Sequence, residues 1–166
     1  MTKRQHVRLE AGFTLIEILM VMAILAILAT VAAPNMSAFM DAQRVKSPAS
    51  DLYASLVLAR SEAITRNASV DLVPNVADWA GGWRVRVQSG GTVLRVQDAY
   101  AARLSITSSQ AGVLTYGGNG RLVTSAATFR IRVPDNPDAR MRCVSIDVSG
   151  RPNVRTDRDS DQTACN

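Results

Sequence analysis

The stretch that decides the fold covers residues 12–35 and reads GFTLIEILMVMAILAILATVAAPN. Its only charged residue is Glu17, and Ile18–Ala33 is apolar apart from Thr30. A helix needs about 20 apolar residues to cross a lipid bilayer, so the stretch has the length and composition of a membrane span. A carboxylate inside such a span is costly, and we therefore expect Glu17 to have a function.

Three kinds of segment fit a basic end followed by an apolar stretch. The basic residues are Lys3, Arg4 and Arg8. A secretory signal peptide would be cut near the small residues 29–33. A plain anchor would keep the basic end in the cytoplasm and carry the rest of the chain across the membrane. Neither interpretation assigns a role to the pair Gly12-Phe13 or to Glu17.

A third interpretation uses these residues. The segment Gly12-Phe13-Thr14-Leu15-Ile16-Glu17 resembles the class III signal of type IV pilins and type II secretion pseudopilins. In that family a prepilin peptidase cuts after the glycine and methylates the new N-terminal phenylalanine. The resemblance implies a leader peptide at residues 1–12 and a mature chain that starts at Phe13.

The same resemblance implies a role for Glu17. In the family this carboxylate pairs with the free N-terminal amine of a neighbouring subunit during filament assembly, which would recover part of the cost of burying a charge. The alternative is an interfacial glutamate near the lipid headgroups, favoured by the positive N-terminus of the helix.

The next segment predicts an amphipathic helix. Its apolar positions share one face or lie beside it: Leu52, Leu56, Ala59 and Ala63, with Tyr53, Val57 and Ile64 alongside. Pro34 and Pro48 either bend one long helix or, at Pro48, mark a new start with Ser47 as N-cap. A helix over 13–66 would be roughly 80 Å long, too long for a head of this size to bury. We therefore expect a membrane and assembly half at residues 13–35 and an amphipathic half at residues 36–66.

From Asn67 onward the apolar residues alternate, which is typical of strands with one buried face. The expected strands cover residues 70–73, 83–87, 92–96, 129–133 and 143–148. Ser89-Gly90-Gly91 predicts a turn, so residues 83–97 read as a hairpin. The prediction is an α+β fold in which a mainly antiparallel sheet, residues 67–166, packs on the amphipathic half of the helix.

Four later stretches are similar to landmarks of the GspH/FimT group of minor pilins and pseudopilins, in the same order. They are Leu56–Ile64, Asp78–Trp83, Leu114–Gly120 and Ser149–Arg151. The resemblance implies a type IV pilin-like fold and a low-copy structural subunit of a type II secretion pseudopilus or a type IV pilus. It implies as partners other pilins of the filament, the prepilin peptidase, the inner-membrane assembly platform and the lipid bilayer. It also implies a single-pass inner-membrane protein with a cytoplasmic N-terminus and a periplasmic head, incorporated into the filament after processing.

The cysteines and the lack of catalytic patterns complete this picture. Cys143 and Cys165 predict one disulfide in an oxidising compartment, the alternative being two free thiols in the cytosol. Beyond the leader there is no histidine, Gly117–Gly120 lacks the residues of a phosphate loop, and Asp157–Asp161 lacks the glycine and glutamate of a calcium loop. We therefore predict no enzyme activity, no cofactor and no metal site.

The alternative function is DNA uptake. Some members of the group resemble DNA-uptake receptors with a Gly-Arg-x-Arg element, and here Gly150-Arg151 is followed by Arg155, two positions late. The net charge is +5, but residues 67–166 hold 12 Arg and 9 Asp, an excess of 3. Phosphate contacts need a larger positive excess. The candidate DNA contacts are Arg151 and Arg155 in the disulfide loop, or a sheet face carrying Arg84, Arg86, Arg130 and Arg132. DNA is a possible partner that the charge does not favour.

Overall fold

The computed structural model describes residues 13–100, 103–134, 136, 139–157 and 165. Within the helix, the side chains of residues 31–35 and 37–38 lie outside this described set. The expected leader, residues 1–12, also lies outside it. By its contacts the chain divides into two units, Met1–Ser37 and Ala38–Asn166, each of which is described by itself.

One helix, α1, extends over Leu15–Arg66 and passes through Pro34 and Pro48 without a break. Pro48 is buried in the helix interior, so the alternative of a new helix start at this residue is wrong. The helix ends where Asn67 adopts the left-handed conformation, with φ 47°. The N–H of Ala68 then donates to the carbonyl of Ala63, which closes the last turn in a Schellman-type cap.

The second half of α1 supplies the central part of the core. The predicted apolar stripe is confirmed, because Leu52, Leu56, Ala59 and Ala63 are fully buried. The three residues expected alongside are exposed at its margin: Tyr53, Val57 and Ile64. The helix therefore buries a narrow stripe against the head and keeps one apolar flank at the surface.

The head contains two four-stranded antiparallel sheets. The first sheet has the order β3-β2-β1-β5, with β1 at Val70–Pro74, β2 at Trp83–Val87, β3 at Val93–Gln97 and β5 at Leu114–Tyr116. The second sheet has the order β4-β6-β7-β8, with β4 at Ser105–Ser108, β6 at Ala127–Arg132, β7 at Arg142–Ile146 and β8 at Pro152–Thr156. A short 3-10 helix, η1 at Trp79–Gly81, precedes β2.

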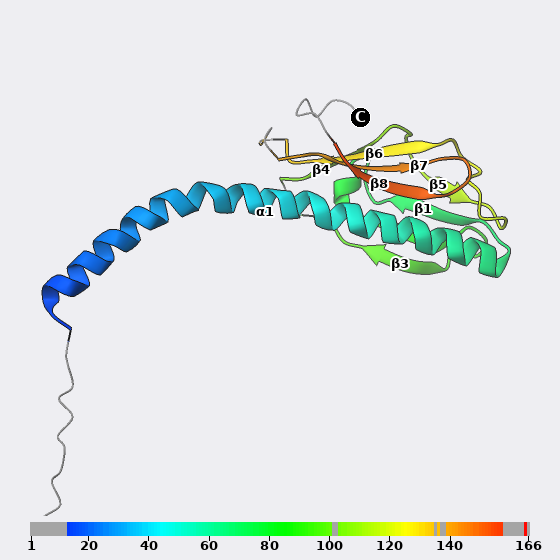
Figure 1. Ribbon diagram of the computed structural model, residues 1–166. Coiled ribbons are helices and arrows are strands. Elements are labelled where there is room, and N and C mark those ends of the chain that lie inside the picture. The colour runs from blue at the N-terminus through cyan, green and yellow to red at the C-terminus, as the bar shows by residue number, and fades with distance from the viewer. Residues whose placement is uncertain (1–12, 101–102, 135, 137–138, 158–164, 166) are drawn as a thin grey trace, which may run out of the picture. The chain divides into compact units, whose positions relative to one another are not determined.

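The sheets confirm the predicted α+β class and the hairpin of residues 83–97, since β2 pairs with β3. The prediction of a single sheet was too simple, and β4, β5 and β8 were not predicted. Figure 1 shows β6, β7 and β8 on one side of the second half of α1 and β3 on the other side. One hydrophobic core therefore joins the helix to the inner faces of both sheets.

Aromatic side chains fill the middle of this core. The rings of Trp79 and Phe129 meet edge to face, with centroids 4.8 Å apart, and so link η1 to the second sheet. The ring centroids of Trp83 and Tyr100 lie 5.9 Å apart. Trp83 also donates a 2.9 Å hydrogen bond from its indole Nε1 to the Oγ of Ser55. Both Trp79 and Trp83 are buried, so the landmark that contains them contributes to the core.

Candidate functional sites on the helix and the sheets

The first turn of α1 places Glu17 close to the proposed mature N-terminus. Thr14 stands just before the helix, and its Oγ1 accepts a 3.3 Å hydrogen bond from the backbone N–H of Glu17. This Thr-x-x-Glu pattern is the spacing of a capping box, a sequence signal that identifies Thr14 as the N-cap. Our sequence prediction did not include Thr14. The cap fixes where the helix begins and hence where the Glu17 carboxylate lies relative to Phe13.

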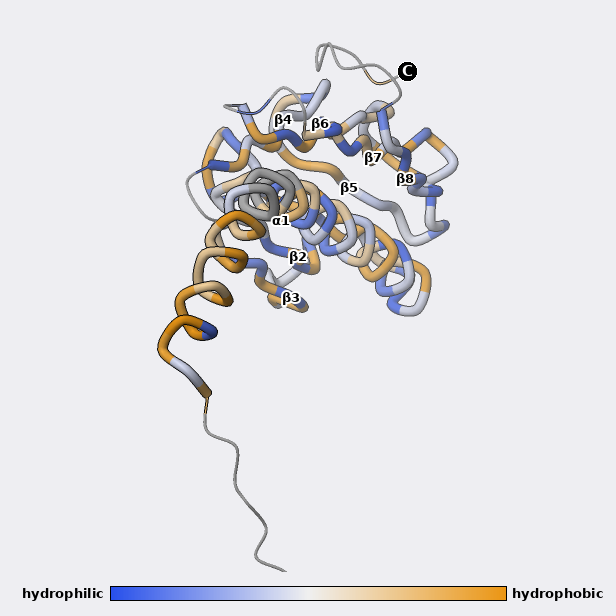
Figure 2. Tube along the Cα trace, turned by 60° about the vertical axis from the view of Figure 1, so that its left-hand side comes forward, coloured by the Kyte–Doolittle hydropathy of each residue, from blue (hydrophilic) through white to orange (hydrophobic). Residues whose placement is uncertain are grey.

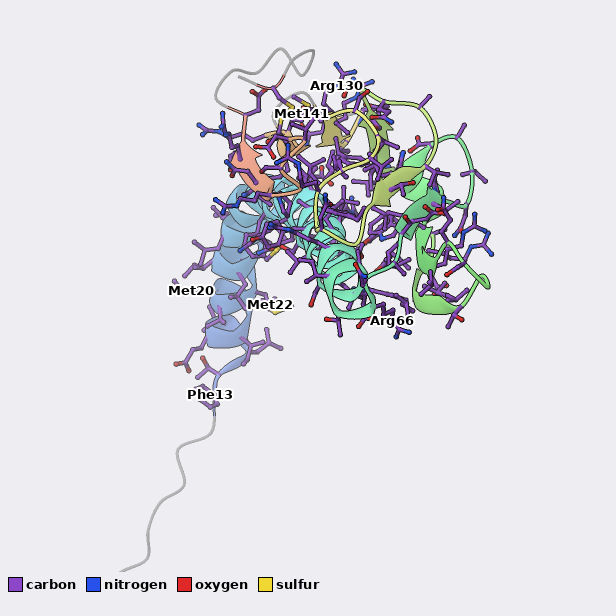
Figure 3. All side chains as sticks on the ribbon, turned by 90° about the vertical axis from the view of Figure 1, so that its right-hand side faces the viewer. Phe13, Met20, Met22, Arg66, Arg130 and Met141 are labelled. Carbon is purple, nitrogen blue, oxygen red and sulfur yellow. A yellow bond between two sulfur atoms is a disulfide. The ribbon has the colours of Figure 1, made fainter. Side chains whose placement is uncertain are left out.

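The side chains of the first half of α1 are exposed on all sides of the helix. All residues from 13 to 30 are exposed, including Phe13 at 79% and Leu28 at 59%. Figure 2 shows this part of the tube in the hydrophobic colour, and Figure 3 shows Met20 and Met22 projecting outward from it. Within the described residues, no helix is both long enough and apolar enough to cross a membrane.

Three of the four landmark stretches, far apart in the sequence, touch one another in the head: Leu56–Ile64, Leu114–Gly120 and Ser149–Arg151. Arg60 on α1 donates from Nε to the carbonyl of Gly120 at 3.1 Å. Gly150 has a positive φ of 78°, and a Cβ there would lie 2.2 Å from the Gly120 carbonyl oxygen. Tyr116 donates its hydroxyl to the carbonyl of Gly150 at 3.4 Å, and burial raises the pKa of this phenol. These motifs therefore hold the helix against the loops, which is a structural role.

Asp78 has a related bracing role in the landmark that contains both tryptophans. Its Oδ1 accepts hydrogen bonds from the N–H of Ala80 at 2.8 Å and of Ile106 at 3.1 Å. The first bond caps η1, and the second ties η1 to β4 in the other sheet. This carboxylate is therefore occupied in joining the two sheets.

A second carboxylate fixes α1 to the connection between β6 and β7. Asp41 is buried and accepts hydrogen bonds from Asn136 Nδ2 at 2.8 Å and from Arg44 Nη1 at 2.7 Å. The hydrogen bond from Asn136, together with the nearby guanidinium of Arg44, holds the pKa of Asp41 below its ordinary value. This contact ties the helix to a loop that follows six of the eight strands in the chain.

The arginine candidates do not form the single basic sheet face that the sequence suggested. Arg84 and Arg86 lie on β2 in the first sheet, whereas Arg130 and Arg132 lie on β6 in the second sheet. All four occupy the non-core side of their strands, as expected. The prediction that the four arginines share one face is wrong, because alternation along the sequence identifies the side of a strand and not the sheet to which the strand belongs.

The second sheet brings the two groups of DNA candidates together instead. Cys143 pairs with Arg130 on β6 and with Arg155 on β8, so both arginines lie on the same outer face, on either side of the cysteine. Arg155 belongs to strand β8 and not to a loop, and Arg151 is exposed just before that strand. Figure 3 shows the Arg130 side chain on the surface of the head. Beside Arg151, a hydrogen bond from Ser149 lowers the pKa of Asp147, which keeps an anion near this face.

The two cysteines form the expected disulfide, with their Cα atoms 6.0 Å apart. Cys143 is buried although it points away from the core. Residues 158–164, which include most of the candidate calcium loop, lie outside the described residues. Among the described residues, no cluster of metal-ligating side chains is present.

Comparison with known proteins supports a pilin-type subunit. Residues 49–150 match the family described as type II transport protein GspH, and residues 7–33 match the prokaryotic N-terminal methylation motif. Among curated proteins there is no match.

Two solved structures resemble the chain. The type IV minor pilin FimU of Pseudomonas aeruginosa is 28% identical, with a TM-score of 0.62 over 74% of this chain and 98% of FimU. The minor pseudopilin EpsH from the type 2 secretion system of Vibrio cholerae is 15% identical, with a TM-score of 0.53 over 68% of this chain and 97% of EpsH, and this likeness supports the fold. Because the GspH match covers more than half of the sequence, the chain belongs to the family of the type II transport protein GspH.

Proposed function

We propose that this protein is a non-catalytic structural subunit, a minor pilin or pseudopilin of a type IV pilus or a type II secretion pseudopilus. The observation that carries the proposal is the division of α1, which joins an exposed apolar half to a half that forms the core of the head. Such a helix needs apolar surroundings, and neighbouring filament subunits or lipid would provide them. The GspH family match and the methylation motif support the same function.

Processing by prepilin peptidase would act at Gly12-Phe13. The methylation motif spans this junction, which supports removal of residues 1–12 and methylation of Phe13. The mature protein would then consist of an assembly segment at 13–35, an amphipathic segment at 36–66 and a head at 67–166.

Assembly would use Glu17. The cap by Thr14 fixes the first helical turn, so the carboxylate lies one turn from the new amine of the mature chain. In an apolar filament interior, an unpaired carboxylate is costly, and the amine of a neighbouring subunit would offset that cost. The pairing would select one axial register between subunits.

The proposed location is the inner membrane, with a cytoplasmic N-terminus and a periplasmic head. The basic residues before the apolar stretch support this orientation. The proposed span, residues 13–35, includes five positions, 31–35, whose side chains lie outside the described set. The assembly platform and the lipid bilayer would be its partners before filament entry.

DNA binding is the second candidate function. The observation that favours it is the placement of Arg130 and Arg155 on one face, on either side of Cys143. The nearby carboxylate of Asp147 and the modest charge excess of the head oppose tight phosphate binding.

The proposed function is tested by isolating sheared filaments from cells that express the full chain and measuring the N-terminus of the copies found there. We expect filament-bound copies to begin at N-methylated Phe13. Copies that begin at Met1, or that occur only in the membrane fraction, would contradict a filament subunit.

A further inference from the structure

The outer face of the first sheet carries an arginine between two valines. Across the strands, Arg84 on β2 pairs with Val73 on β1 and with Val96 on β3. Residues directly opposite on neighbouring strands point to the same face, so the three side chains form one row. In the next row, Arg86 pairs with Val93 on β3. The face is therefore a mixture of apolar side chains and guanidinium groups.

The two arginines differ in their partners. Arg86 Nε lies 3.7 Å from Oδ2 of Asp71, which also accepts a 2.8 Å hydrogen bond from Thr115. Arg84 has no ion pair with a carboxylate of the described residues. Asp98, the first residue after β3, is exposed and forms no ion pair with Arg84. Arg86 thus has an internal counter-ion, and Arg84 has none.

The surroundings of Arg84 suit an interface. Val96 is 55% exposed and Val93 is 48% exposed, so covering this face would bury apolar surface. A guanidinium whose neighbours are apolar binds a carboxylate more strongly once water is excluded, and its planar fork of N–H groups can donate to both carboxylate oxygens at once. In the other sheet, by contrast, Arg132 pairs with Ser105 and Arg130 pairs with Thr107, so each of these arginines has a polar neighbour on the adjacent strand.

We propose that Arg84, between Val73 and Val96, docks a carboxylate of a neighbouring filament subunit, a pilin that presents Asp or Glu beside apolar side chains. The charge of Arg84 selects an acidic group, and the valines select a protein surface over a free anion. Because β3 is an edge strand of its sheet, the row ends at an open side of the head. This inference rests on the proposed function, because it names the kind of neighbour that the subunit contacts.

The test measures the share of the full chain found in sheared filaments for wild type and variants. We expect Arg84→Glu to reduce this share about tenfold, the scale for losing one charge-assisted contact. Val96→Glu should reduce it as much, because the new carboxylate pairs internally with Arg84. This variant should unfold at the same or a higher denaturant concentration than wild type, which a structural role would not produce.

The matched control is Arg132→Glu, which reverses an arginine on the outer face of the other sheet. Its share in filaments should equal that of wild type. Wild-type incorporation by Arg84→Glu and Val96→Glu would overturn the inference, as would an equal loss in Arg132→Glu, which would show a general charge effect. Absence of the wild-type chain from filaments would instead overturn the proposed function, and the inference with it.

Discussion

Trp83 and Ser55, 28 positions apart in the sequence, form a side-chain hydrogen bond inside the core. The indole Nε1 donates to the serine Oγ at 2.9 Å, and the same hydroxyl donates to the carbonyl of Asp51 at 2.8 Å. One serine on the buried side of α1 therefore gives the buried indole its hydrogen-bond partner.

Loss of the Ser55 hydroxyl should destabilise the head. Ser55→Ala leaves the buried Nε1 of Trp83 without a partner, which costs about 1–3 kcal/mol. Urea unfolding of the full chain in detergent, followed by circular dichroism, measures this loss. Ser50→Ala removes an exposed hydroxyl from the same helix and should change stability by less than about 0.5 kcal/mol. Equal effects of the two substitutions would contradict a specific role for the pair.

Removal of the Glu17 carboxylate should separate membrane insertion from assembly. Glu17→Ala should insert as well as wild type or better, because a costly polar group is lost. Its share in sheared filaments should fall, since the partner for the neighbouring amine is missing. Membrane fractionation and immunoblotting measure both quantities. Normal incorporation of the variant would show that Glu17 is only an interfacial residue.

Opening the disulfide should weaken the head. In the chain-entropy model, a bond between residues 22 positions apart contributes about 3 kcal/mol to the free energy of unfolding. Unfolding curves with and without reductant should differ by about this amount. Replacing both Cys143 and Cys165 with serine should reproduce the reduced curve and remove the response to reductant. Two alkylatable thiols in unreduced protein would contradict the bond.

Acid should break the contact between Asp41 and Asn136. The folded pKa of Asp41 lies below the ordinary value of 3.8, so its stabilising effect is present above that pH and is lost as the pH falls through the folded pKa. Unfolding curves measured from pH 5 to pH 2 should show a steeper loss for wild type than for Asp41→Asn. Parallel pH profiles would show that this carboxylate does not contribute.

DNA binding by the head should be weak at physiological salt. Arg130, Arg151 and Arg155 can make about three phosphate contacts, and such contacts weaken steeply as salt rises. Anisotropy titrations with duplex DNA at low and physiological salt measure the affinity and its salt slope. Any low-salt binding should disappear when Arg130 and Arg155 are both changed to glutamine. Micromolar binding at physiological salt would support a DNA receptor.

Sequence patterns predicted the elements with strong periodicity and missed those without it. The apolar stripe through Leu52 and Leu56 and the alternation in β2 and β6 could be recognised in the sequence, because each pattern repeats over several residues. Strand β5 has only three residues and β8 begins with Pro152, so neither contains enough alternation to be recognised.

Partners between elements were harder to predict than the elements themselves. The position of Arg130 beside Cys143 depends on strand register, which long-range pairing decides. At Pro48, the local sequence was compatible with either a bend in one long helix or the start of a new helix. In the structure the helix is continuous and Pro48 is buried. Contacts made in the folded head thus determined what the local sequence left open.

The contact between Asp41 and Asn136 joins residues 95 positions apart in the sequence. This sequence separation affects the rate at which the head folds. A fold rich in such distant contacts forms slowly, on a timescale of about milliseconds to seconds. The chain is made from its N-terminus, so the apolar stripe of α1 exists before β6 and β7 have been synthesised. Until these strands arrive, Leu52 and Leu56 lack part of the core that covers them in the folded head, and such exposed apolar surface is prone to aggregate. A factor that shields this stripe before the head has folded would therefore increase the yield of folded subunit without contacting the finished fold.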